Sequence, residues 1–410
     1  MRSNILGPVD AALRERAMRV IPSGMYGHQH ARGLPPGYPQ FYERGKGCHV
    51  WDVDGRRYID FMCSWGPIVL GHRHAGVDAA AARQAAAGDT LNGPSERMVE
   101  LAEKLVGLIA HADWAIFAKN GTDATTTCVT LARGATGRKK ILAAIGAYHG
   151  AVPWCSPHPL GVTAEDRVHL ITFDYNDIAS LERAVDQAGV DLAGILVSAY
   201  KHDIGIDQQL PTRAFAERAR ELADANGAAL ILDDVRGGFR LDLRGSWETV
   251  GVRPDLSAWS KAIANGYGLA AVTGNDRFRE VASNAFVTGS FWCSSVSMAA
   301  AIATLDELVA IDAPAHMHRM GLRLRDGFAR QAAKYGLALR QSGPPQMPTV
   351  LFENDVDWSK GARFCSEAVQ RGVFLHHRHN MFLSTAHTEA TIDEALSVTD
   401  EAFAAVANAF

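Results

Sequence analysis

The chain has 410 residues and a formal net charge of −4, with 47% hydrophobic and 21% charged residues. This composition is ordinary for a soluble enzyme of two domains or lobes, and the lack of a long basic run argues against nucleic acid or an anionic membrane as partner. No apolar stretch approaches the roughly 20 residues that span a bilayer, and residues 1–19 lack the apolar core of a signal peptide.

Cysteine and histidine spacing excludes further classes of protein. The six cysteines are scattered without C-x-x-C spacing, which argues against a zinc ribbon or a disulfide framework and favours a reducing compartment. The histidine clusters at 72–74 and 376–379 lack the i, i+4 spacing with a carboxylate that is typical of a metal site. We therefore expect a cytoplasmic protein without a bound metal.

The predicted elements begin with a turn-rich N-terminal region. A strong turn signal at Asp54-Gly55 predicts a hairpin over Val50–Tyr58. The middle of the chain alternates strand and helix patterns, and a helix predicted from Thr212 to Ala225 is stopped by Asn226-Gly227. The strands predicted in this region are 115–118, 140–144, 168–173, 194–198 and 229–233.

This alternation predicts the fold class. Short strands separated by helices form right-handed βαβ units, so we expect an α/β fold with a mostly parallel central sheet covered by helices. After about residue 300, long helical patterns alternate with strands near 349–352 and 373–376, and a last helix starts near residue 388. A smaller α+β domain built from both termini is therefore expected. The expected divisions are 1–62 for an N-terminal segment with part of the small domain, 63–300 for the large domain, and 301–410 for the C-terminal small domain.

Two charged positions follow two of the short apolar strands. Lys261 comes after residues 255–260, and Asp233 and Asp234 end the strand that starts at Ala229. Such residues can converge at the edge of a parallel sheet, where ligands bind in open α/β folds. An amine that forms a Schiff base and a carboxylate that keeps a pyridine nitrogen protonated are what pyridoxal 5′-phosphate (PLP) chemistry needs.

Each of these residues also has a simpler interpretation. A lone lysine after an apolar strand is usually a solvated surface residue, and the two aspartates could hold Mg²⁺ in a nucleotide hydrolase. That hydrolase would need a phosphate loop of the form G-x-x-x-x-G-K-[S/T]. The nearest candidate, at 134–139, has the wrong spacing and lacks the hydroxyl, which disfavours the hydrolase.

Two further motifs lie between strands and helices. Asn120-Gly121-Thr122 offers backbone N–H groups, a glycine and a hydroxyl at a helix start, which together form a ready phosphate site. Tyr148-His149, followed by a glycine, ends the next strand and could supply an aromatic face for a planar ring. Taken singly, the first motif is more often a capped turn and the second is more often structural.

In this order, the motifs resemble the class III (ω-type) aminotransferases of PLP fold type I over nearly the whole chain. Residues 119–124 resemble that family's N-S-G-T-E-A phosphate loop, 148–150 its Y-H-G, and 233–240 its D-E-V-x-x-G-F-R. The resemblance implies a PLP cofactor and assigns catalytic roles to Lys261, Asp233 and Tyr148. The cofactor-binding residues that it implies are Asn120, Gly121, Thr122, Tyr148, His149, Asp233, Val235, Lys261 and Ser290.

The resemblance also implies which residues contact the two faces of the cofactor ring and which segment reaches a neighbouring subunit. The resemblance implies that Tyr148 stacks on the cofactor ring and that Val235 packs against the opposite face. Residues 288–292 resemble the segment that reaches the phosphate of the neighbouring subunit, with Ser290 where threonine is usual. We therefore expect a homodimer with shared active sites.

Within class III, the chain resembles the glutamate-1-semialdehyde aminomutase branch and, by overall similarity, the bulky-amine aminotransferases of the fumonisin-degrading kind. The aminomutase carries a carboxylate-binding arginine shortly after the turn at 21–24, but this chain has Tyr26 to His30 there, with Arg32 two residues later. A histidine cannot replace the two-bond grip of an arginine on a carboxylate. Either Arg32 serves instead or the donor has no carboxylate beside its amine, and we favour the second. Trp65 and Tyr26 are expected to be walls of the substrate pocket.

The expected function is therefore PLP-dependent transfer of an amino group from a bulky amine to a 2-oxo acid such as pyruvate. An aminomutase or a racemase would use the same cofactor and the same lysine. A fold-type-I protein without catalysis is disfavoured because the lysine, aspartate, tyrosine and phosphate hydroxyls are all present. The sequence does not identify the amine, the stereochemistry, or which of Arg32, Arg236 and Arg378 meets the acceptor carboxylate.

Overall fold

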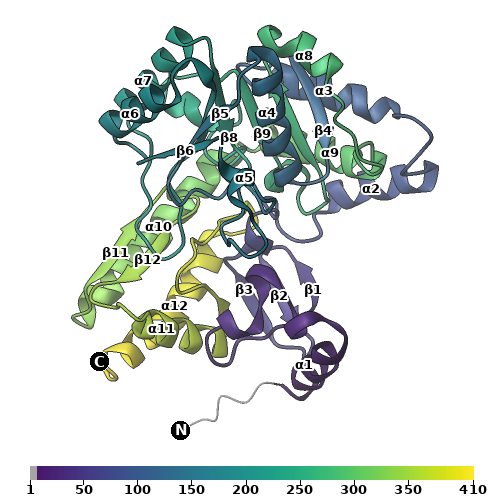
Figure 1. Cartoon of the computed structure of the whole chain (residues 1–410). Coiled ribbons are helices and arrows are strands. Elements are labelled where there is room, and N and C mark those ends of the chain that lie inside the picture. The colour runs from purple at the N-terminus through teal and green to yellow at the C-terminus, as the bar shows by residue number, and fades with distance from the viewer. Residues whose placement is uncertain (1–6) are drawn as a thin grey trace.

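The computed structural model describes residues 7–410, and the side chain of Arg32 lies outside this description (Figure 1). Its centre is a seven-stranded sheet in the order β4-β10-β9-β8-β7-β5-β6. The strands are β4 (Trp114–Ala118), β5 (Lys140–Ala144), β6 (Leu170–Phe173), β7 (Leu192–Ser198), β8 (Ala229–Asp233), β9 (Leu256–Trp259) and β10 (Ala270–Gly274). Of these strands, β10 alone runs against the others. The mostly parallel sheet expected from the sequence is confirmed.

Strand β8 shows how the sheet is covered on both faces. Alternate residues of a strand point to opposite faces, and every residue of β8 is buried. Ala229 and Ile231 pack with α4 (Gly121–Thr136), whereas Leu230 and Leu232 pack with α6 (Ile178–Ala188) and α7 (Arg213–Ala225). The same alternation puts the side chain of the last residue, Asp233, on the α4 side. Short helices α5 (Ala164–Arg167) and α8 (Arg279–Asn284) and the longer α2 (Ala75–Ala87), α3 (Glu96–Leu108) and α9 (Ser295–Ala310) complete this part.

A second, four-stranded sheet joins the two ends of the chain (Figure 1). It contains β1 (Tyr42–Lys46), β2 (His49–Asp52), β3 (Arg57–Asp60) and β13 (Val373–Phe374). The hairpin predicted around Asp54-Gly55 is β2–β3, and β13 pairs with β3 in parallel. The same part of the molecule contains α1 (Pro8–Val20), α10 (Ala313–Lys334), α11 (Ser359–Gln370) and α12 (Glu389–Ala407). A separate hairpin of β11 (Leu339–Ser342) with β12 (Thr349–Phe352) contacts α10 and α11. The smaller unit built from both termini is confirmed, while its expected boundaries stay a prediction.

Sequence and structure differ in small ways. Strand β10 was not predicted, because its residues are small and follow a glycine-bearing loop directly. Strand β6 begins at Leu170, two residues later than expected, and β13 ends at Phe374 instead of residue 376. No helix within residues 7–410 is long and apolar enough to cross a membrane.

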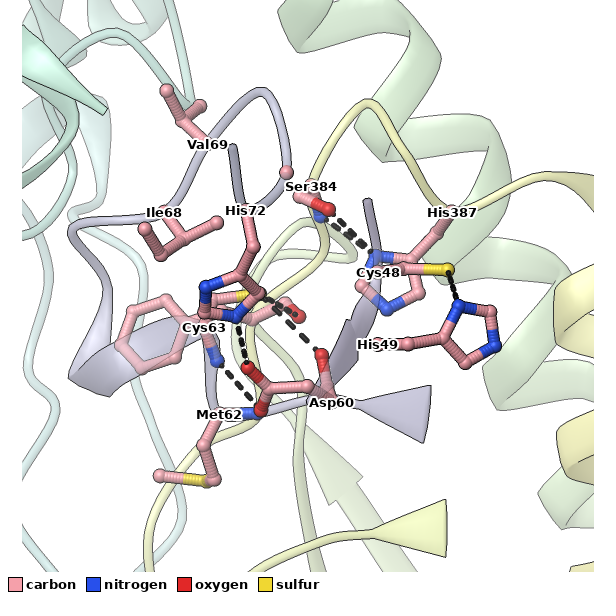
Figure 2. Close-up of polar contacts among 12 residues, drawn as sticks. Cys48, His49, Asp60, Met62, Cys63, Ile68, Val69, His72, Ser384 and His387 are labelled. Carbon is pink, nitrogen blue, oxygen red and sulfur yellow. Dashed lines mark hydrogen bonds and ion pairs between the residues drawn. The ribbon is translucent and has the colours of Figure 1, made fainter. Parts of the chain in front are cut away.

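A strained turn connects the small sheet to the large one. Cys63, Ser64 and Trp65 follow one another with φ angles of 47°, 54° and 66°, in the left-handed region that residues with a side chain avoid. Figure 2 shows how the buried Asp60 holds this turn. Its carboxylate accepts hydrogen bonds from the backbone N–H of Met62 at 2.8 Å and of Cys63 at 3.0 Å, and from His72 Nε2 at 2.8 Å. The Asp60 carboxylate therefore stabilises the turn from which the Trp65 side chain projects.

Candidate active site

The carboxyl ends of β8 and β9 open into a cavity of about 770 Å³. Asp233 ends β8, and Lys261 comes two residues after β9, which pairs with β8 through Asp233 and Ala258. The cavity brings together most of the predicted site residues, which are Tyr26, Asn120, Gly121, Thr122, Tyr148, His149, Asp233, Val235 and Lys261. The expectation that the strand-end lysine and aspartate converge at the sheet edge therefore agrees with the structure.

Lys261 has an unusual backbone conformation and an amine with a lowered pKa. Its φ angle of 46° lies in the left-handed region, and it begins the short 3-10 helix Lys261–Ala264. Burial and, to a smaller extent, the nearby charge of Arg236 lower the pKa of its amine, Asp233 acts against them, and the pKa that results is about 7. An amine with such a pKa is a competent nucleophile and base near neutral pH.

The two neighbouring aspartates have separate environments. Asp233 Oδ2 accepts a hydrogen bond from His149 Nδ1 at 2.7 Å, and Oδ1 accepts one from the backbone N–H of Val235 at 3.1 Å. Asp234 points away from the cavity and accepts hydrogen bonds from the hydroxyl and the backbone N–H of Ser246. Burial raises the pKa of Asp234 to about 7. Asp233 is therefore the carboxyl that can face a ligand in the cavity.

The start of α4 forms the part of the cavity expected to hold a phosphate. Asn120 caps the helix, because its side chain accepts a hydrogen bond from the Asp123 N–H at 3.1 Å and the Asp123 side chain answers with the reciprocal bond. The N–H groups of the first turn have no partner within a helix. Gly121 lies so close to Val235 that a Cβ would come within 2.8 Å of that side chain, so only glycine fits here. The helix end therefore presents free donors next to Asp233.

Tyr148 and His149 follow β5 and come from the loop beside α4. Tyr148 is 43% exposed and lines the cavity, and burial of part of its ring raises the pKa of its hydroxyl. The His149 carbonyl accepts a hydrogen bond from the Thr125 hydroxyl at 2.6 Å, which ties this loop to α4. Gly150 has a φ of 136°, and a Cβ there would meet the Thr122 hydroxyl at 2.7 Å.

The N-terminal segment contributes another wall. Tyr26 and His28 line the cavity, and the His28 ring packs edge-on against Trp65 with ring centroids 4.8 Å apart. Trp65 itself lines a neighbouring cavity of about 390 Å³ that is mainly apolar. The two cavities meet at this His28–Trp65 contact.

Some predicted residues are not brought to the cavity within one chain. Ser290 is exposed and does not line it. The side chain of Arg32 lies outside the described residues. Four lining residues were not predicted, namely His28, Thr125, His202 and Ser260, although His202 follows the end of β7 by only four residues. Residues 7–410 contain no group of three side chains that could hold a metal ion.

Comparison with known proteins agrees with this geometry. The family model of the class-III aminotransferases matches residues 34–410. The chain is 48% identical over 398 residues to the aminopentol aminotransferase of Sphingopyxis macrogoltabida, covering 97% of this chain and 94% of that protein. The solved PLP internal aldimine form of the FumI protein from Sphingopyxis sp. MTA144 has a TM-score of 0.96 at 48% identity, covering 98% of this chain and 97% of that one.

A second type of relative has a different reaction in its name. Glutamate-1-semialdehyde 2,1-aminomutase of Rhodopirellula baltica is 33% identical over 422 residues, covering 96% of each protein. The fold and the lysine-bearing cavity are those of a fold-type-I PLP enzyme. More narrowly, the chain belongs to the class-III aminotransferase family. It is a transaminase that uses pyridoxal 5′-phosphate, which confirms the fold class, enzyme class and cofactor expected from the sequence.

Proposed function

We propose that this transaminase takes its amino group from a bulky amine without an α-carboxylate and delivers it to a 2-oxo acid such as pyruvate. The observation that carries the donor class is that the stretch from Tyr26 to His30, in which His30 stands where the aminomutase branch has its arginine, contributes Tyr26 and His28 to the cavity wall. Burial lowers the pKa of His28, so its imidazole is neutral at pH 7. A neutral imidazole offers one N–H donor and cannot grip a carboxylate through two charged bonds.

The size of the donor is supported by the second cavity. Its lining is mainly apolar and adjoins the lysine-bearing cavity at the contact between His28 and Trp65. Apolar residues that line it are Met25, Leu34, Phe41, Met62 and Phe374. Moving an apolar chain attached to the reacting amine from water into this cavity would lower the free energy of binding. Moving a charged group there would raise it.

The residues around the larger cavity fit PLP, which when bound supplies an electron sink for the carbon that carries the amine. We propose that the N–H groups at the start of α4 and the Thr122 hydroxyl hold the phosphate. Asp233 would keep the ring nitrogen protonated, with His149 fixing the orientation of its carboxylate. Tyr148 and Val235 would contact the two faces of the ring.

Lys261 has the proposed catalytic role. Its Nζ accepts a proton from the substrate carbon and returns one, and a pKa of about 7 suits both directions near neutral pH. The pairing of β8 with β9 fixes the position of this lysine relative to Asp233.

We further propose a homodimer in which each active site receives Ser290 from the partner. Ser290 lies in an exposed stretch with Phe286, which is 96% exposed, and Phe291, which is 63% exposed. Large apolar side chains exposed together mark an interface. Dilution to monomer should release PLP in parallel, as measured by light scattering and cofactor absorbance. A monomer with full activity would contradict the shared site.

A cytoplasmic location is also proposed. All six cysteines of the chain are free thiols, and such thiols persist in a reducing compartment. Fractionation of the producing cells, with immunodetection of the protein in each fraction, tests this location.

The donor class is tested by an amine screen with pyruvate as acceptor. The panel should contain long-chain primary amines, ω-amino acids, β-amino acids and α-amino acids, with alanine formation as the readout. We expect the highest kcat/KM for a long-chain amine without a carboxylate. A preference for an amino acid that carries an α-carboxylate would refute this donor class.

The aminomutase remains the second candidate because of the relative from Rhodopirellula baltica, which covers 96% of this chain. An aminomutase keeps its intermediate and needs no external acceptor, so the two functions differ in whether a 2-oxo acid is consumed. Isomerisation of glutamate-1-semialdehyde without added 2-oxo acid, faster than any amine is transaminated, would establish the aminomutase instead.

A further inference from the structure

Arg236 is a half-buried cation whose Nε is buried and which has no carboxylate partner among the described residues. It lies three residues after Asp233 and lines the lysine-bearing cavity. No carboxylate among residues 7–410 lies within 4.0 Å of its guanidinium, and its Nε is buried without a hydrogen-bond partner. Removing a charge from water without pairing it is costly, so an unpaired, partly buried guanidinium indicates that an anion from outside the chain completes the site.

The orientation of this guanidinium is fixed from one side. Its Nη1 donates to the Oδ1 atom of Asn380 and, at 3.1 Å, to the Nε2 atom of His379. His379 can accept there because its Nδ1 donates to the Asn380 carbonyl at 2.8 Å. Asn380 is fixed as well, since its Nδ2 donates to the Met381 carbonyl at 2.8 Å. The donor and the acceptor of each hydrogen bond in this network are therefore defined. Two nitrogen atoms of the Arg236 guanidinium, Nε and Nη2, make no hydrogen bond with any described residue.

The other positive groups near the cavity do not offer the same binding mode. Arg240 donates from both terminal nitrogens to the carbonyls of Gly66, Ile68 and Leu383, and although its Nε has no partner, this residue does not line the cavity. The Arg378 guanidinium lies over the ring of Trp358, 4.9 Å from its centroid. Burial lowers the pKa of His202 well below its usual range, so this ring is neutral at pH 7. Among the described residues that line the cavity, Arg236 is thus the one guanidinium.

We propose that Arg236 binds the carboxylate of the 2-oxo acid acceptor through Nε and Nη2. The inference rests on the proposed function in that the acceptor is a 2-oxo acid. Nε and one terminal nitrogen of an arginine are spaced to meet the two oxygens of a carboxylate in parallel bonds. The arginine is held before the acceptor arrives, so little side-chain entropy is lost on binding.

This arrangement also separates the two substrates of one site. The acceptor carboxylate meets Arg236, whose anchors Asn380 and His379 come from the loop after β13. A donor without a carboxylate has no use for this guanidinium and is selected at the His28–Trp65 wall. The aminomutase branch binds a carboxylate with an arginine in its N-terminal segment. In this chain Arg236, which follows the end of β8, would take over that role.

The direct test is binding of propionate, a carboxylate that cannot react, to the PLP-loaded enzyme by calorimetry. Arg236→Gln should weaken this binding about 10- to 100-fold, the range for a lost hydrogen bond to a charged group. Arg236→Lys keeps the charge but not the fork and should give an intermediate value. Arg378→Gln is the matched control and should bind propionate like the unaltered enzyme. Equal propionate affinity in all four proteins would overturn the inference, whatever the amine donor proves to be.

The kinetic test compares pyruvate with butane-2,3-dione, in which an acetyl group replaces the carboxylate. Arg236→Gln should raise the KM for pyruvate about 10- to 100-fold while changing the KM for the dione less than 3-fold. A structural role would weaken both acceptors together, and that result would overturn the inference. So would a changed absorbance spectrum of the bound cofactor with unchanged propionate binding, because Arg236 would then serve the cofactor. If no donor is transaminated by the unaltered enzyme, the proposed function fails while the propionate titration still decides the role of Arg236.

Discussion

Two walls of the same cavity are built in different ways. Asp233 and Lys261 come from the ends of adjacent strands, where the register of β8 with β9 sets their separation. Tyr26 and His28 come from short turns near the N-terminus, outside any strand. The sheet therefore fixes the residues proposed to react, while irregular segments carry those proposed to select the substrate. Such segments can change in sequence without disturbing the sheet, which allows one chemistry to serve many amines.

Among substitutions of residues at the strand ends, replacing Lys261 with alanine should reduce turnover the most. No other amine lines the cavity among the described residues, so the proton at the substrate carbon would lose its acceptor. We expect kcat for an amine donor with pyruvate to fall by about 10³-fold or more. Lys140→Ala, at the opposite end of a strand in the same sheet, is the control and should keep normal turnover. Full activity in Lys261→Ala would disprove the assignment.

Asp233→Asn should slow the reaction severely but leave PLP bound. An amide cannot hold the ring nitrogen as a cation, and loss of such an electrostatic stabiliser typically costs about 10²-fold in rate. The measurement is single-turnover conversion of the loaded enzyme by excess amine, followed by absorbance. The neighbouring Asp234→Asn serves as control, because that carboxyl faces Ser246 and should alter the rate far less. Similar rates in both variants would refute the distinction between the two carboxyls.

The pH dependence of cofactor uptake tests the environment of Lys261. Its pKa is lowered to about 7, so the group is an ammonium ion below that pH and a free amine above it. Only the amine can attack the aldehyde of PLP, and the uptake rate of PLP-free enzyme should fall about 10-fold per pH unit below 7 and level off above it. Arg236→Gln removes a charge that lowers this pKa and should move the midpoint upward. A midpoint near that of an exposed lysine would contradict the buried position.

Trp65→Ala should change activity the least, and it should change only the preference among amine donors. Without the indole, the two cavities would join, and the ratio of kcat/KM between a long-chain and a short-chain amine should shift by about 10-fold. The KM for pyruvate should stay the same, because the ring lies in the wall assigned to the donor. An equal loss for both amines would mean that Trp65 only supports the fold.

Much of the reactive wall could be predicted because it depends on local patterns. Apolar runs that end in a charged residue indicated Asp233 and Lys261 as candidate site residues. The capping pattern at Asn120 predicted the start of α4. The two hydrogen bonds that fix Arg236 join residues 143 and 144 positions apart, and no local pattern encodes such contacts. The sequence therefore left three arginines open for the acceptor carboxylate. The place of Trp65 in a neighbouring cavity likewise depends on packing with His28 and two other histidines, His376 and His379.

The turn of Cys63, Ser64 and Trp65 has a consequence for directed evolution. A residue with a side chain costs about 1–2 kcal/mol in the left-handed conformation, and glycine avoids that cost. Ser64 is exposed, so Ser64→Gly should raise the melting temperature without disturbing packing. The same substitution would widen the range of directions open to the adjoining indole. A thermostability screen is therefore expected to enrich glycine at this position and, in doing so, to produce enzymes that discriminate less among amines.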